Sequence, residues 1–336
     1  MSGSSGATAW TESYLGGSPE REEELVRRFA DQIHEVQRRN RKRFGEPIRR
    51  AFHAKLLAGI GDARVEISHD LRPELATGML APGATYPAIV RLSSASGMIQ
   101  PDYAEDLRGI AVRILLEKGE TQDLLMTNAP ASHARDARQF MVTALATAGG
   151  RRLGAIPRLV LALGPWEAVR ILRALRRAAS RHVESVATET FWSRGPFAIG
   201  PRAVKLILRP EAQDLGTPAV KGSDSLRTEF VRRLGRDDIR YLLQVQHFLD
   251  ERRTPIEDGA VEWTEADAPP ETIAKVILPR QRLEAGDAGE RERSIDELAF
   301  SPWNAGGGLY PIGGLNRARR LVYPASARLR AQPPSP

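Results

Sequence analysis

Short apolar segments of strand character, grouped between helical stretches, place the strongest constraint on how this chain folds. Six strands are predicted on this basis, at residues 65–67, 86–92, 109–116, 124–126, 202–208 and 275–278. Turn residues such as Ala81-Pro82-Gly83 separate some of them, and residues 240–248 fit either a strand or a helix. Because these strands do not alternate regularly with helices, they indicate an α+β fold with an antiparallel sheet or barrel, and not a doubly wound fold.

Helical patterns lie on either side of the predicted strands. From Pro19 to Lys42 the chain is charged, and apolar side chains recur at the spacing of one helical face, at Leu25, Phe29, Ile33 and Val36. Residues 134–148 and 315–329 are also predicted to be helical. Pro324 should break or kink the second of these helices, because proline cannot donate a backbone hydrogen bond.

The domain organisation is predicted to be simple. Residues 1–18 are expected to form a flexible N-terminal arm, and residues 331–336 a C-terminal tail. Polar connectors are predicted at 216–225 and 284–293, but neither divides the chain into halves, and the sequence has no internal repeat. We therefore expect a single domain over residues 19–330.

The sequence of 336 residues contains no cysteine. This excludes disulfides, thiolate catalysis, zinc ribbons and iron–sulfur clusters, so a metal would need His, Asp, Glu or Tyr ligands or would arrive inside a cofactor. The start of the chain, Met1–Gly6, has neither the basic residues nor the apolar stretch of a signal peptide. No apolar run approaches the length of a membrane span, which takes about 20 residues. These features together predict a cytoplasmic protein.

Lys and Arg exceed Asp and Glu by 49 to 42, and such an excess identifies a partner only where it clusters. One cluster lies in residues 155–182, where Pro165 can begin a helix whose arginines share a face, at Arg170, Arg173, Arg177 and Arg181. Three interpretations stay open: a solvated surface helix, an interfacial helix on anionic lipid, or a nucleic-acid face. The apolar run 159–163 before it favours peripheral membrane contact or an apolar access channel, so no nucleic-acid partner is expected.

His53 is a candidate acid/base residue, although a histidine beside apolar residues can also be a satisfied core group. Arg50 and Lys55 place cations near it. Arg91 and Ser93 lie on a predicted strand and share one face of it, because side chains alternate with a period of two. A serine hydroxyl facing His53 would fix the imidazole tautomer, which is what a general acid/base needs.

Tyr323 is a candidate metal ligand, although it could also be one aromatic residue in a basic helix. Arg319 lies four residues earlier, so on a helix its cation sits beside the phenol oxygen and favours the phenolate. A phenolate is a hard anionic ligand suited to ferric iron. Arg50, Arg91 and Arg330 are then candidates to bind two cofactor carboxylates, since arginine binds carboxylates bidentately.

Six segments, in the right order from Arg50 to Arg330, resemble conserved segments of the catalase family. They are Arg50-x-x-His53-Ala54-Lys55; Val90-Arg91-Leu92-Ser93; Asp106-Leu107-Arg108-Gly109-Ile110-Ala111-Val112; the block from Asp123 to Asp136 with Asn128 and Pro130; Pro255-Ile256-Glu257-Asp258 with Trp263; and Arg319-x-x-x-Tyr323-Pro324 with Arg330. The resemblance implies an eight-stranded antiparallel β-barrel with flanking α-helices. It also implies one haem b with Tyr323 as axial iron ligand, peroxide as substrate and a homo-oligomer.

Several residues depart from the catalase pattern. Thr127 falls where catalases carry the distal asparagine and Asn128 follows it, so either residue could hold the peroxide. Phe140 falls at the position of a further distal phenylalanine of the haem pocket. Three other aromatics are replaced, by Leu92, Ser132 and His133. The chain is also shorter than a typical catalase. It therefore resembles a minimal, catalase-related branch, whose pocket is expected to be wider and more polar.

The leading hypothesis is a haem-dependent peroxidase or weak catalase that acts on hydrogen peroxide or organic hydroperoxides, with a one-electron donor or a second peroxide as co-substrate. His53 would transfer the peroxide proton to the leaving oxygen, Ser93 would orient His53, and Thr127 or Asn128 would hold the peroxide. An alternative enzyme class is isomerisation or cleavage of an apolar hydroperoxide, or oxidation of a dedicated apolar metabolite. A non-catalytic alternative is a membrane- or nucleic-acid-binding protein that uses the arginine-rich face of residues 170–181.

Overall fold

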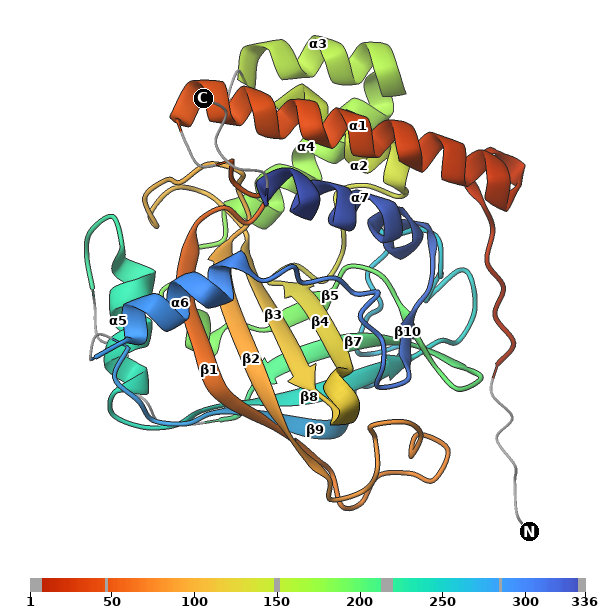
Figure 1. Ribbon diagram of the computed structural model, residues 1–336. Coiled ribbons are helices and arrows are strands. Elements are labelled where there is room, and N and C mark those ends of the chain that lie inside the picture. The colour runs from red at the N-terminus through yellow and green to blue at the C-terminus, as the bar shows by residue number, and fades with distance from the viewer. Residues whose placement is uncertain (1–7, 46–47, 148–151, 213–219, 284–285, 332–336) are drawn as a thin grey trace.

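A computed structural model describes residues 8–45, 48–147, 152–212, 220–283 and 286–331. Its central element is an antiparallel β-barrel (Figure 1). The barrel strands are β1 Leu56–Ile67, β2 Thr85–Ser94, β3 Arg108–Leu115, β4 Thr121–Thr127, β5 Phe191–Ser193, β7 Arg202–Pro210, β8 Ile239–His247 and β9 Glu271–Leu278. They follow the order β7-β5-β4-β3-β2-β1-β9-β8, and pairing of β8 with β7 closes the ring. The predicted α+β class and eight-stranded barrel are confirmed.

Two short strands extend the barrel at β7. β6 Phe197–Ile199 pairs with β7, and β10 Leu309–Pro311 pairs with β6. This antiparallel extension brings the chain back toward the barrel shortly before the C-terminal helix begins at Gly314.

The barrel interior is filled by apolar side chains and is not a pore. On β2 the inward-facing residues Ala88, Val90 and Leu92 have no measurable exposure, and they join one large core cluster. Because a strand alternates its side chains between two faces, Arg91 and Ser93 point to the other side of the sheet. A functional site must therefore lie outside the barrel, against this second face.

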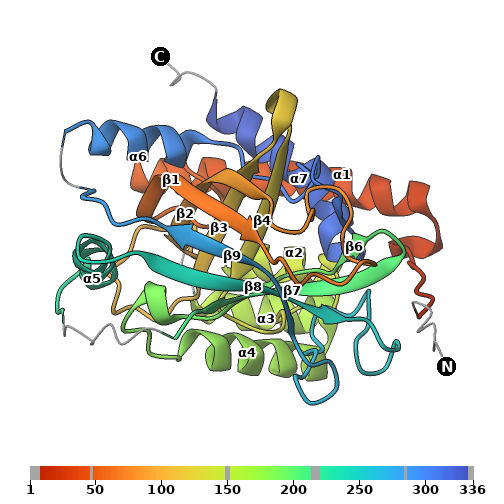
Figure 2. The same cartoon turned by 90° about the horizontal axis from the view of Figure 1, so that it is seen from below.

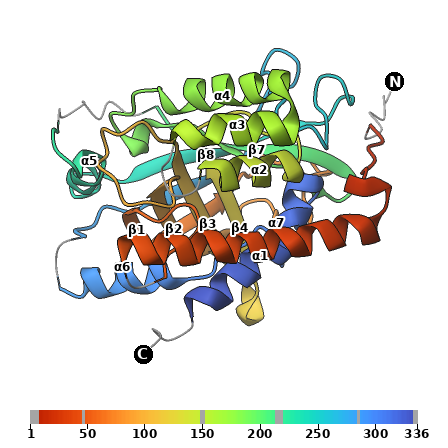
Figure 3. The same ribbon diagram turned by 90° about the horizontal axis from the view of Figure 1, so that it is seen from above.

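Helices cover that second face (Figures 1 and 3). They are α1 Pro19–Phe44, α2 Ala137–Thr147, α3 Arg152–Leu163, α4 Pro165–Ala179 and α7 Gly314–Arg330, while α5 Ser225–Leu234 and α6 Ala288–Glu297 lie at the side of the barrel. Short 3₁₀ turns occur at Leu15–Gly17, Glu117–Gly119 and Val186–Thr188. Figure 2, from below, shows β8 and β9 closing the far side of the barrel.

Helix α1 begins and packs as its sequence pattern predicts. The Ser18 hydroxyl accepts a hydrogen bond from the Arg21 backbone and Pro19 follows, which are two common features of a helix start. Its apolar stripe, which includes Phe29 and Ile33, packs on α2 and α7. Residues far apart in sequence thus build one apolar layer above the barrel.

Two local predictions need correction, and one alternative is decided. Residues 240–247, which fitted either a strand or a helix, belong to strand β8. Helix α7 runs without interruption through Pro324. The predicted connector at 284–293 contains the start of α6 instead. This helix is mostly charged and is held partly by polar contacts: the Glu292 carboxylate accepts a hydrogen bond from the Gly59 backbone at 3.0 Å. Part of the other connector, 213–219, lies outside the described residues.

Residues 10–17 lie along the molecule and make specific contacts. The Trp10 indole donates to the Pro201 carbonyl at 3.0 Å, and the Glu12 carboxylate accepts from the Gly313 backbone at 2.7 Å. Residues 1–7 and 332–336 lie outside the described residues, so the division into arm, domain and tail stays a prediction. In the described part of the chain, no helix is both long and apolar enough to cross a membrane.

Candidate active site

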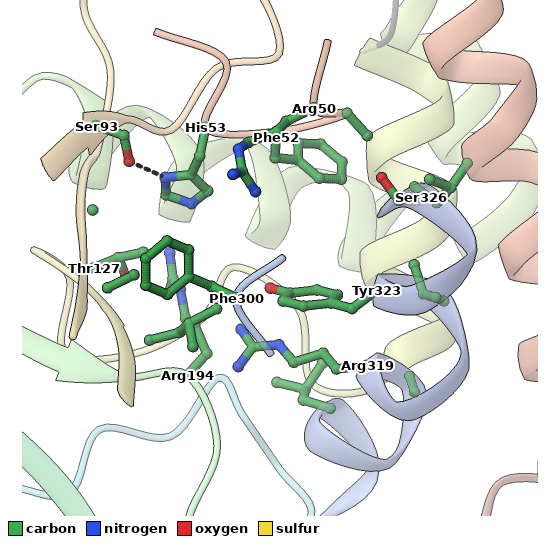
Figure 4. A pocket seen from close by; sticks show the side chains of 18 of the residues that line it. Arg50, Phe52, His53, Ser93, Thr127, Arg194, Phe300, Arg319, Tyr323 and Ser326 are labelled. Atoms are coloured by element: carbon green, nitrogen blue, oxygen red, sulfur yellow. Dashed lines mark hydrogen bonds between the residues drawn. The ribbon is translucent and has the colours of Figure 1, made fainter. Parts of the chain in front are cut away.

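A cavity of about 190 Å³ lies between the outer face of β2–β4 and helices α1, α2 and α7 (Figure 4). The sheet contributes the small or polar residues of alternating positions, among them Ser93, Gly109 and Thr127. Nine of the ten residues predicted for the site line this cavity, namely Arg50, His53, Arg91, Ser93, Thr127, Phe140, Arg319, Tyr323 and Arg330. The fold thus brings residues from both ends of the sequence to one place.

His53 is held in a rare backbone conformation and in a defined orientation. Its φ of 58° is positive, and its backbone amide donates to the Ala95 carbonyl at 2.9 Å. The imidazole Nδ1 lies 3.0 Å from the Ser93 hydroxyl, in agreement with the predicted pairing of these residues. The Arg91 guanidinium also donates to the His53 carbonyl at 2.8 Å. Together these contacts fix both the position and the ring direction of the imidazole.

Gly109 makes room for the imidazole. A Cβ atom at this position would lie 2.4 Å from His53 Cε1 and 2.6 Å from Nδ1, which is closer than side-chain contacts allow. Gly109 faces Ser93 across the β2–β3 ladder, so the same strand pair supplies the hydroxyl and the empty space. The glycine is needed here because of close approach and not because of its backbone angles.

The electrostatic environment keeps His53 neutral. Desolvation in the cavity wall, followed by the nearby cations of Arg91 and Arg194, lowers the pKa of His53 to about 3. At neutral pH the ring is therefore uncharged, with its Nδ1 atom in contact with the Ser93 hydroxyl. This is the state that a general base requires.

The structure separates the two alternatives for the distal polar residue. Thr127 lines the cavity, and its hydroxyl is buried without a hydrogen-bond partner. Asn128 does not line the cavity, because its amide accepts from the Arg108 backbone at 2.7 Å and donates to Glu189 at 3.0 Å. The expectation that Asn128 belongs to the site therefore needs correction, since its side chain ties neighbouring segments together.

Three replacements of catalase aromatics predicted a wider pocket, but only one of these positions lies at the cavity. Ser132 lines it. Leu92 points instead into the barrel core, because it occupies the inward-facing register of β2. His133 is not among the lining residues and packs against Phe140, with ring centroids 5.4 Å apart. Only Ser132 can therefore enlarge the cavity directly.

Tyr323 reaches the cavity from α7, and its hydroxyl points inward (Figure 4). The guanidinium carbon of Arg319, one turn earlier, lies 5.6 Å from the centre of the Tyr323 ring. The predicted i, i+4 relation between these residues is therefore present. The arginine and the tyrosine therefore form a cation–π pair at the cavity wall.

Three arginines gather at another part of the cavity wall. Arg91 binds Asp296 at 2.7 Å, and Arg50 donates to backbone carbonyls, but the Nε atoms of Arg50 and Arg330 are buried without partners. Burial, followed by the cations of Arg91 and Arg330, lowers the pKa of Arg50 to about 9. The cluster therefore has an excess of positive charge and unused donors, which suits carboxylates of a bound molecule.

Arg194 lines the cavity and was missed from the sequence. It follows the three-residue strand β5, which pairs with β4 beside Thr127, and it donates to the Ala131 carbonyl at 2.8 Å. Figure 4 shows its side chain extending toward Thr127. The aromatic pair Phe191-Trp192 before a Gly-Pro turn was the available signal for this strand.

The comparisons with known proteins agree with the fold. A family model described as Catalase matches residues 25–148. A bacterial catalase superposes with a TM-score of 0.67 at 20% identity, covering 97% of this chain and 66% of its own. A fungal catalase gives 0.65 at 18% identity, with 87% and 61% covered. Catalase A from Saccharomyces cerevisiae gives 0.66 at 15% identity, with 96% and 68% covered.

The chain thus spans about two thirds of the length of these solved catalases. Among curated protein sequences, none matches this chain. Residues 25–148 thus match the catalase family model, and the solved catalases share the fold of this chain. Catalases generally bind haem, so the residues around the cavity can be tested against that group.

The cavity residues fit a haem group. Among the described residues, no three His, Cys, Asp or Glu side chains gather to hold a bare metal ion. A single phenol, Tyr323, reaches the cavity instead, which suits a metal that arrives inside a cofactor. The unpartnered guanidinium atoms of Arg50 and Arg330 suit the two carboxylates of haem.

Replacing Gly109 by alanine should displace the imidazole while keeping the barrel. A Cβ 2.4 Å from His53 Cε1 forces the ring or the strand to move, and displacements near 1 Å can cost about 10² in rate. Peroxide-dependent oxidation of an aromatic donor measures the loss. Gly289→Ala is the matched control, because nothing lies within 4 Å of that position. Equal rates in both variants would show that the close approach does not position His53.

Proposed function

We propose that the protein is a haem-dependent peroxidase or weak catalase that activates hydrogen peroxide or organic hydroperoxides. The observation that carries the proposal is the meeting of His53 and Tyr323 in one arginine-rich cavity, although 270 residues separate them in sequence. A haem b held through Tyr323 would supply a redox-active iron able to cleave the O–O bond. The match of residues 25–148 to the catalase family model supports this assignment.

The chain's own residues would share the work of binding. Arg50, Arg91 and Arg330 would pair with the cofactor carboxylates, while Arg319 would pack its cation against the ring of Tyr323, the proposed iron ligand. The rings of Phe52 and Phe140, whose centroids are 5.7 Å apart, supply an apolar wall. This division places positive charge where an anionic ligand needs it and leaves the remaining wall apolar.

The reacting peroxide would meet three polar side chains. His53, neutral at physiological pH, would accept the proton of the near oxygen and return it to the leaving oxygen. Ser93 would keep the ring in place, and the Thr127 hydroxyl would hold the peroxide. Arg194 would stabilise negative charge that develops on the leaving oxygen, as fixed donors do in other active sites.

The alternative enzyme class, conversion of an apolar hydroperoxide or oxidation of an apolar metabolite, is supported by the cavity wall itself. Its helical side carries mainly apolar residues, among them Ile33, Met141 and Val322. Testing a fatty hydroperoxide beside hydrogen peroxide separates the two. The identity of the reductant, the homo-oligomer and the cytoplasmic location stay predictions.

Tyr323→Phe should abolish or markedly weaken haem binding, because it removes the only oxygen proposed to ligate the iron. The wild-type protein should carry about one haem b with a ferric, tyrosinate-type absorption spectrum. Tyr310→Phe is the matched control, since Tyr310 is 58% exposed on β10. Unchanged haem content and spectrum in Tyr323→Phe would refute the assignment of the ligand.

His53→Ala should retain haem but lose peroxide activation by about 10²–10⁴-fold, the usual contribution of a positioned acid/base. Because desolvation is the largest cause of the lowered pKa of His53 and persists when the neighbouring cations are offset, protonation of this ring should produce an acid limb only below the ordinary histidine pKa of about 6.5. Stopped-flow absorbance measures both effects, with His69→Ala at an exposed position as control. Full activity in His53→Ala would assign the proton transfer to another group.

The balance between reactions should favour donor oxidation. Oxygen evolution from hydrogen peroxide should be slow, because Thr127 replaces an amide that would hold a second peroxide and Ser132 widens the cavity. Rapid oxygen evolution without donor oxidation would identify a plain catalase instead.

Arg194→Met should lower oxidation of small aromatic donors by about 10²–10³-fold, and Arg194→Lys should retain part of the rate because it keeps the charge.

A further inference from the structure

The hairpin of α3 and α4 carries most of the exposed large apolar side chains of the described structure. Nine such side chains are exposed, and five of them lie between residues 156 and 169. They are Ile156 (50% exposed), Val160 (37%), Leu161 (91%), Trp166 (86%) and Val169 (41%). Scattered single apolar residues are normal on a surface, but a cluster on one hairpin marks an interaction site.

Packing of the hairpin explains which face stays open. Ala155, Leu159 and Ala168 form a small core with Ala146 of α2, so one face of α3 and α4 is already used. Figures 1 and 3 show α3 and α4 at the edge of the molecule, with α2 between them and the barrel. The tryptophan and leucine near the α3–α4 turn therefore face away from the protein.

Arginines flank this apolar surface without matching acids. Arg158, Arg173, Arg176 and Arg177 are exposed, and none of them has an ion pair among the described residues. Glu167 is the only acidic residue between 152 and 183, and it already binds Arg170 at 2.9 Å. The hairpin thus combines an apolar tip with a basic flank, the composition of a segment that lies in a membrane interface.

We propose that the α3–α4 hairpin docks on the surface of an anionic lipid bilayer. Leu161 and Trp166 would enter the boundary between headgroups and acyl chains, and the four unpaired arginines would contact lipid phosphates. A twofold contact with a second copy fits less well, because it would place the same unpaired arginines against each other. A nucleic acid would match the arginines but not the exposed apolar tip.

Flotation of the full-length protein with vesicles tests this surface. Vesicles of phosphatidylcholine alone should bind little, whereas vesicles that also contain phosphatidylglycerol should bind the protein, and salt should weaken this binding. The combined variant Arg173→Gln, Arg176→Gln, Arg177→Gln should lose about 10²-fold in affinity, since each cation near such a surface contributes about fivefold. The combined variant Leu161→Ser, Trp166→Ser should also lose binding.

Matched variants elsewhere on the molecule separate the hairpin from general surface effects. Tyr310→Ser removes an exposed apolar side chain on β10, and Arg232→Gln, Arg236→Gln, Arg252→Gln removes three exposed charges outside the hairpin. Both controls should bind anionic vesicles as the wild type does. Absence of wild-type binding to anionic vesicles, or equal losses in the control variants, would overturn the proposal. Light scattering that shows a dimer lost on Leu161→Ser, Trp166→Ser, without vesicle binding, would assign the surface to a second copy.

Discussion

The candidate site depends on how α7 is fixed to the rest of the protein. Near its start, Arg317 forms ion pairs with three carboxylates, those of Glu12, Glu22 and Glu257, which come from the N-terminal segment, α1 and the loop after β8. Burial lowers the pKa of Arg317, but the hydrogen bonds to Glu22 and Glu257 outweigh it and raise that pKa above its ordinary value. A partly buried cation with several acceptors has one favourable geometry, so this cluster sets the position of the helix.

The position of α7 decides the chemistry of the cavity, because three of its side chains form one wall. Arg319, Tyr323 and Arg330 recur at intervals of four and seven residues, which places them along one side of a helix. The opposite wall is the outer face of β2–β4, whose inner face is occupied by the barrel core. The site therefore lies between two rigid elements, and its geometry follows from the fact that the same strands present apolar residues to one side and polar residues to the other.

Several features could be predicted from the sequence because each has a local signal. The alternation of β2 placed Arg91 and Ser93 together, and the helical spacing placed Arg319 beside Tyr323. The order of the six segments that resemble the catalase family indicated the barrel. It also predicted that residues from both ends of the chain meet in one site. In contrast, whether Thr127 or Asn128 faces the cavity depends on the tertiary partners of Asn128, which no local pattern records.

Other features had weak local signals. Strand β5 has only three residues, so neither it nor Arg194 at its end was predicted. Helix α6 is charged on most sides and is held by hydrogen bonds of Glu292 to Gly59 and Arg227, so its sequence resembled a connector. The replacement at Leu92 was assigned to the pocket, although the inward register of β2 places it in the barrel core. The first two errors arose from weak local patterns, and the third arose because side-chain direction, and not residue type, decided the outcome.

The charges around the cavity link binding of an anionic group to the base strength of His53. The largest effect on the pKa of His53 is desolvation, followed by the cations of Arg91, Arg194, Arg50 and Arg319. Two of these, Arg50 and Arg91, belong to the cluster proposed to hold carboxylates, and Arg319 lies beside the phenol proposed to ligate the iron. Anions placed there would offset these cations, so the pKa of His53 would rise when the site is filled. The residues that bind the ligand would then also make His53 a stronger base, without any change in the position of the ring.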